Sequence, residues 1–135
     1  MSRVRKGTVP PGFRTRAEAW KFQQDGTVVA YMRRIDYDGT QPCAGDDAFI
    51  HEGDYPKGEL EIMAGMCAAC PFLQACGDYA LAHERYNYYA GETPRTRALR
   101  RRKLNIQVVD KYSSELYGLT SRGWPAVAEA TRATA

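Results

Sequence analysis

All four cysteines of this 135-residue chain fall within 34 residues. Cys43 comes first, and 23 residues separate it from the pair Cys67 and Cys70, which have CxxC spacing; Cys76 follows after five more residues. Cys67 and Cys70 stand about one helical turn apart, so both can bind one centre. Chance burial of cysteine as a small apolar residue does not explain such clustering. We therefore expect the four thiols to meet at a single site.

Three kinds of site are compatible with this spacing. A zinc ion holds four sulfurs roughly 4 Å from one another, and structural zinc sites usually use two CxxC knuckles, whereas this chain has one. A cubane iron–sulfur cluster is wider, so one knuckle with two separated cysteines suits it. Small residues beside the cysteines would let the backbone approach closely, among them Ala68, Ala69, Ala75 and Gly77. The spacing favours a cluster over zinc, and disulfides or free thiols are the third alternative.

Helical patterns surround the cysteines. Apolar residues recur at three- and four-residue spacing from Leu60 to Cys70, and again over about 71–84. Thr93 followed by Pro94 is typical of a helix start, and that helix should run to about Leu104. Between the second and third of these helices, residues 87–91 are predicted to form a turn in which Gly91 is free to take a positive φ.

The two ends of the chain give weaker patterns. Residues 1–16 combine prolines and glycines with basic residues, which is typical of a flexible arm. Ala19, Trp20 and Phe22 could start an amphipathic helix, and residues 27–32 could form a helix or a strand.

From these patterns we expect an all-α fold, a small helical domain around the cysteines with flexible basic terminal arms. Its expected parts are an N-terminal extension (1–40), a cluster-binding domain with a basic helix (41–105) and a C-terminal tail (106–135).

Charge is strongly segregated along the chain. Residues 1–36 carry a net charge of +5, residues 37–94 of −8 and residues 95–135 of +6. Six cations fall within nine residues of the last helix, where they could neutralise phosphates and release counterions; the alternative is a solvated helix end. Nothing resembles a set of base-reading residues. The pattern predicts DNA backbone contacts by Arg95, Arg97, Arg100, Arg101, Arg102 and Lys103.

From about residue 41 to 104, the chain resembles the WhiB-like (Wbl) proteins, the iron–sulfur regulators of actinobacteria and their phages. The resemblance rests on the order of the cysteines, with Pro71 directly after the CxxC, and on the segment from Cys76 to Ala80. An acidic and aromatic segment over 46–51, an aromatic turn and the basic helix support it.

This resemblance implies that Cys43, Cys67, Cys70 and Cys76 ligate a [4Fe–4S] cluster that is sensitive to oxygen or nitric oxide. It implies a transcription regulator that docks on domain 4 of the primary sigma factor of RNA polymerase, while the basic segment touches promoter DNA. The aromatic turn departs from the family pattern, because Tyr89 stands where a tryptophan is usual and only the last glycine is kept. We expect the partner surface to consist of Phe49, Tyr88, Tyr89 and Gly91; core packing is the alternative for Phe49 and Tyr89. Such divergence suits a phage-borne member that competes with host relatives.

Other classes of protein fit less well. There is no Ser/His/Asp constellation, no glycine-rich phosphate loop and no convincing pair of carboxylates, so we predict no enzyme. The alternatives are a thiol–disulfide oxidoreductase, if the metal-free CxxC cycles as a dithiol, and a zinc-stapled interaction module. No apolar run approaches the ~20 residues of a membrane span, and the basic N-terminus is unlike a secretory signal. We therefore expect a cytoplasmic protein.

Overall fold

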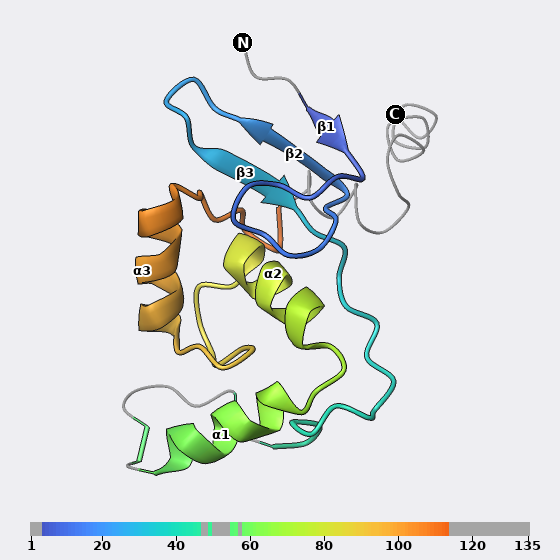
Figure 1. Cartoon of the computed structure of the whole chain (residues 1–135), viewed down its shortest axis with the longest axis vertical. Coiled ribbons are helices and arrows are strands. Elements are labelled where there is room, and N and C mark those ends of the chain that lie inside the picture. The colour runs from blue at the N-terminus through green and yellow to red at the C-terminus, as the bar shows by residue number, and fades with distance from the viewer. Residues whose placement is uncertain (1–3, 47–48, 50–54, 57, 114–135) are drawn as a thin grey trace.

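The computed structural model describes residues 4–46, 49, 55–56 and 58–113. In these ranges the chain forms three strands and then three helices: β1 (Arg5–Lys6), β2 (Ala19–Phe22), β3 (Val28–Tyr31), α1 (Glu59–Ala68), α2 (Leu73–His83) and α3 (Pro94–Leu104). Figure 1 shows the sheet at one end of the molecule, α1 at the other, and α2 and α3 between them. The prediction of an all-α fold is therefore wrong, since the fold is mixed α/β.

The sheet is antiparallel in the order β1-β2-β3, and Ala19 lies opposite Tyr31. All four residues of β3 are buried, which suits its run of β-branched and aromatic side chains. The far edge of β3 is also covered, because Val28 donates its N–H to the Asn105 carbonyl and accepts from the N–H of Gln107. The segment expected to start a helix at Ala19 is thus a strand, because its backbone groups are paired by β1 and β3.

The described part of the N-terminal segment is packed rather than a free arm. Pro10 and Phe13 are buried. The buried carboxylate of Asp78, in α2, accepts the backbone N–H groups of Arg14 and Thr15 and the Thr15 hydroxyl. The expected flexible basic arm is therefore wrong for residues 4–16.

One hydrophobic core joins the sheet to α2. It draws residues from the N-terminal loop, the sheet, the end of α2 and the segment after α3: Phe13, Ala17, Trp20, Val28, Ala30, Met32, Leu81, Ala82 and Ile106. His83 strengthens the junction, because its Nε2 accepts the N–H of Met32 at 2.9 Å and its Nδ1 lies 3.0 Å from the Val109 carbonyl oxygen. This core crosses the expected boundary between residues 40 and 41.

A second, smaller core lies against α1. It consists of Phe49, Met63, Cys67 and Tyr88. Only Met63 and Cys67 of α1 are buried, so this helix is attached through one narrow face. Among the described residues, no single helix has the length and apolar character to cross a membrane; α1 and α2 meet that test only together, as a pair bent by 116°.

Candidate metal centre

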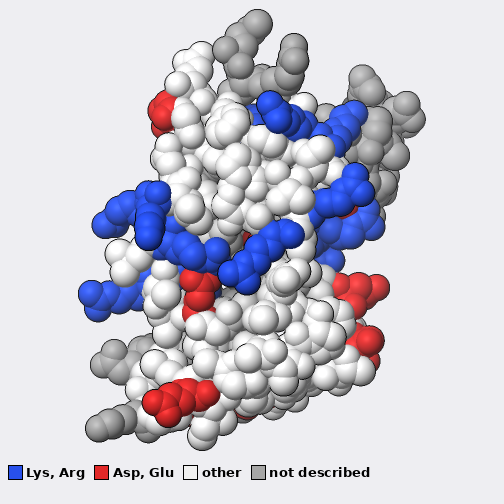
Figure 2. All heavy atoms as spheres, viewed as in Figure 1, with Lys and Arg blue, Asp and Glu red and all other residues white. Residues whose placement is uncertain are grey.

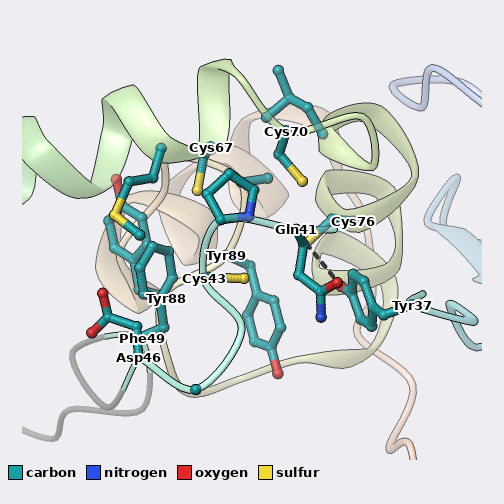
Figure 3. Close-up of a pocket in the computed structure, with 15 residues that line it drawn as sticks. Tyr37, Gln41, Cys43, Asp46, Phe49, Cys67, Cys70, Cys76, Tyr88 and Tyr89 are labelled. Atoms are coloured by element: carbon teal, nitrogen blue, oxygen red, sulfur yellow. Dashed lines mark hydrogen bonds between the residues drawn. The ribbon is translucent and has the colours of Figure 1, made fainter. Parts of the chain in front are cut away.

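The four cysteines line a single cavity of about 300 Å³. Cys43 comes from the loop that follows the sheet, Cys67 from α1, Cys70 from the α1–α2 connection and Cys76 from the first turns of α2. Figure 3 shows side chains from these separate segments gathered around one space. The structure thus brings together the four thiols that their spacing predicts to share a site.

The four thiols do not form a preformed single-ion site among the described residues. All four cysteines are free thiols rather than disulfides. Within the described ranges, no three His, Cys, Asp or Glu side chains stand close enough to hold a single metal ion. A zinc ion would need its sulfurs roughly 4 Å apart, whereas a four-iron cluster places its ligands around a wider body.

Hydrogen-bond donors surround the sulfurs. The N–H of Phe72 donates to Cys70 Sγ at 3.4 Å, and the Tyr37 hydroxyl donates to Cys76 Sγ at 3.3 Å. The helix α2 begins directly after Phe72, so the positive end of its dipole lies at the cavity. A [4Fe–4S] core with four thiolates is an anion, and no Lys or Arg is found among the described residues that line the cavity. Backbone and hydroxyl donors would therefore balance its charge.

Burial changes the pKa of three of the four thiols. Burial raises the pKa of Cys43 and Cys67, and raises the pKa of Cys76 to about 11. The backbone N–H groups of Gly91 and Ala90 act in the opposite direction on the Cys67 pKa without overcoming its burial. Dithiol catalysts instead depend on a lowered thiol pKa. The raised pKa of Cys67 therefore acts against the oxidoreductase alternative, in which Cys67 and Cys70 would cycle as a dithiol.

A tight turn supplies one wall of the cavity. Tyr89 and Glu92 exchange two backbone hydrogen bonds, of 3.1 and 2.9 Å. Ala90 and Gly91 between them have φ values of 51° and 83°, as a type I′ turn requires. The positive φ expected at Gly91 is confirmed, and the turn holds Ala90 against the cavity.

The expected partner surface is only partly at the surface. Phe49 and Tyr88 are 7% and 3% exposed, and their rings meet edge to face at 5.3 Å. They form a wall of the cavity, so they cannot serve as exposed docking residues. Tyr89 is half-buried with its hydroxyl bonded to Glu84, and Gly91 is exposed. Residues 47–48 and 50–51 of the acidic and aromatic segment lie outside the described ranges.

Two of the six predicted DNA-binding cations are interior. Arg97 and Arg101 are 0% and 8% exposed. Arg97 donates to the carbonyls of Glu84, Tyr86 and Asn87, at 2.8 to 3.1 Å. Arg101 donates to the carbonyls of Ala80, Leu81 and Glu84. Both guanidinium groups thus satisfy carbonyls at the C-terminal end of α2 and its continuation, where cations are favoured, and they cannot contact DNA.

The remaining cations of α3 differ in their exposure and in their partners. Arg100 forms two hydrogen bonds with the Glu92 carboxylate, of 2.8 and 2.6 Å. Arg95, Arg102 and Lys103 are exposed. Figure 2 shows Lys and Arg side chains over α3 and in a band that continues across the middle of this face, with acidic residues below it. The candidate DNA surface on α3 is therefore reduced to these three exposed cations.

Sequence reasoning overlooked Tyr37 and Gln41, which also line the cavity. Both lie a few residues before Cys43, and proximity to that cysteine was the one signal that could have indicated them.

Comparisons of the chain with protein-family models, with curated proteins and with solved structures gave no match.

Proposed function

We propose that this protein holds a [4Fe–4S] cluster in the four-cysteine cavity and regulates transcription through it. The observation that carries the proposal is the convergence of four free cysteines on one cavity, with hydrogen-bond donors to the sulfurs of Cys70 and Cys76. Cys43, Cys67, Cys70 and Cys76 would be the ligands. A bound cluster would supply redox-active iron, while the buried walls exclude water and hold the ligands in place.

The regulatory part of the proposal rests on the resemblance to WhiB-like proteins. The partner would be domain 4 of the primary sigma factor, bound beside the cavity through the surface around Tyr89 and Gly91. Arg95, Arg102 and Lys103 are exposed on α3, which begins shortly after that turn, so they would contact promoter DNA in the complex. A phage-borne protein of this kind would compete with host relatives for the sigma factor.

The first test is the metal content of protein purified without oxygen. We expect about four irons and four sulfides per chain, and each Cys→Ser variant at the four positions should lose most of both. Ala44→Ser, which adds a hydroxyl at an exposed position next to Cys43, is the matched control and should keep both. About one zinc without sulfide in the unaltered chain would overturn the cluster and leave a zinc-stapled module.

The second test is binding to sigma domain 4 and to promoter DNA. The cluster-loaded chain should retain sigma domain 4 in a pull-down. Neutralising Arg95, Arg102 and Lys103 to Gln should weaken DNA binding of the complex and lower the slope of log K against log salt by up to about 3. Failure of the loaded chain to bind the sigma domain would overturn the regulatory proposal and leave the cluster untouched.

A further inference from the structure

A linker between the sheet and the first cysteine passes over the cavity. It begins after Met32, whose N–H is fixed by His83, and leads to Cys43. Tyr37 and Gln41 on this linker both line the cavity, and Figure 3 shows their side chains next to Cys76. Tyr37 lies outside the segment that carries the family resemblance, so no property of that family assigns it a role.

The geometry of Tyr37 gives it two contacts at the cavity. Its hydroxyl is 3.3 Å from Cys76 Sγ, and its ring meets Phe72 edge to face with centroids 5.2 Å apart. The residue is 40% exposed, so it separates solvent on one side from the cavity on the other. The hydroxyl is therefore placed to donate to Cys76 Sγ.

Gln41 provides an independent sign that this wall faces a hydrogen-bonding group. Its Oε1 is buried and has no hydrogen-bond partner among the described residues. A buried amide oxygen without a partner is costly, and the oxygen and nitrogen of a side-chain amide are interchangeable by a half-turn. That half-turn would place an N–H donor where the oxygen now lies, at the wall of the cavity next to Tyr37.

We propose that Tyr37 is a hydrogen-bonding shield for the cluster: its hydroxyl donates to the Cys76 thiolate, and its ring closes that side of the cavity to solvent. This inference rests on the proposed function. Hydrogen bonds to ligand sulfurs and solvent exposure both tune the potential of an iron–sulfur centre. A donor to sulfur stabilises the more negative, reduced state, so it raises the midpoint potential.

Two substitutions separate the hydroxyl from the ring. Tyr37→Phe keeps the ring on Phe72 and removes only the donor, whereas Tyr37→Ala removes both. Tyr112→Phe is the matched control, because Tyr112 is 81% exposed and lies outside the cavity. All chains are purified without oxygen, and iron and sulfide are measured before a redox titration followed by absorbance. Loss of the cluster in air is then timed.

We expect equal iron and sulfide in all four proteins. The midpoint potential of Tyr37→Phe should shift to a more negative value, and Tyr37→Ala should in addition lose its cluster in air several-fold faster. Alkylation of Cys76 in the metal-free chain, followed by mass spectrometry, should also be several-fold faster in Tyr37→Ala. Unchanged potentials, lifetimes and alkylation in loaded variants would overturn this inference alone. Absence of iron and sulfide from the unaltered chain would instead overturn the proposed function, and this inference with it.

Discussion

His83 is a buried titratable residue whose two ring nitrogens are both engaged. Nε2 accepts the N–H of Met32, so Nδ1 carries the proton and donates it to the Val109 carbonyl. Burial lowers the pKa of His83 to about 4, the nearby Arg101 acts in the same direction, and Val109 and Glu84 oppose the change. The ring of Tyr79 packs beside it, with centroids 5.2 Å apart. The imidazole is therefore neutral and joins three segments.

We expect this histidine to make the protein less stable in mild acid. In the unfolded chain, the His83 imidazole binds a proton at its ordinary pKa of 6.5. In the folded chain, its pKa is about 4, so it binds that proton only at lower pH. Stability is therefore full above pH 6.5 and falls as the pH drops toward 4, by up to about 3 kcal/mol from this group. Urea unfolding from pH 7 to pH 4.5 measures the change.

The comparison protein for this measurement is His83→Gln, which cannot titrate. His51→Gln removes the other histidine of the chain and serves as control. Carboxylates that titrate over the same range contribute to all three proteins, so the difference isolates His83. An equal loss of stability in His83→Gln and in the unaltered chain would contradict the assignment.

Individual residues could be predicted from the sequence only where spacing defines their role. The four cysteines share a cavity, as their clustering predicts. Arg97 and Arg101 could not be recognised as interior, because a run of cations ordinarily indicates a solvated or nucleic-acid-binding helix. Their partners are backbone carbonyls, and only the packing of α3 against α2 brings these within reach.

At the scale of elements, the contact between α2 and α3 depends on those two guanidinium groups. The last carbonyls of a helix have no partners within it. In α2 and the residues after it, Arg97 and Arg101 supply the missing donors from α3. Basic residues thus attach one helix to the other, in place of an apolar seam.

Loss of Arg97 should therefore destabilise the fold. Arg97→Ala removes the donor to the carbonyls of Tyr86 and Asn87, while Glu84 keeps its bond from Arg101. We expect a loss of about 3 kcal/mol in the free energy of unfolding. Arg102→Ala, an exposed arginine of the same helix, should change it by less than about 0.5 kcal/mol. Denaturant titration of both variants measures this; similar values for the two would show that burial of Arg97 is not stabilising.

The helices were more predictable than the strands because their signals are local. Thr93 caps α3 by accepting the N–H of Thr96, and Pro94 is the first helical residue, as their order in the sequence predicts. The strand β2 has four residues and β1 has two, too few for alternation to be distinguished from a helical start. Their identity is set by pairing between distant segments, which no local pattern encodes.

In the described part of the molecule, the two hydrophobic cores at the sheet and at α1 meet along α2, and a third cluster of Ala19, Val29 and Tyr31 lies in the sheet. The larger core joins the sheet to the end of α2 and does not include any cysteine. The smaller core contains Cys67 and packs against Cys43 and Leu73, and α1 is attached mainly through it. The cavity therefore belongs to the less extensively packed part of the fold.

Removal of the proposed cluster should loosen these regions unequally. Chelation of its iron would take away a centre held by α1, the loop of Cys43 and α2, so amides of α1 should lose most of their protection. Amides of β2 and β3 should exchange at nearly unchanged rates. Hydrogen exchange with mass spectrometry, before and after chelation, measures both, and uniform loss of protection throughout the described chain would contradict this division.

The pairing of Val28 with Ile106 has a consequence for how the protein is made on the ribosome. The sheet is synthesised before the helices, yet the far edge of β3 is covered only by residues that follow α3. All four cysteines precede those residues in the chain, so they leave the ribosome before that edge can be covered. We therefore expect the thiols to be accessible to metal donors during translation, before the N-terminal sheet can close its core.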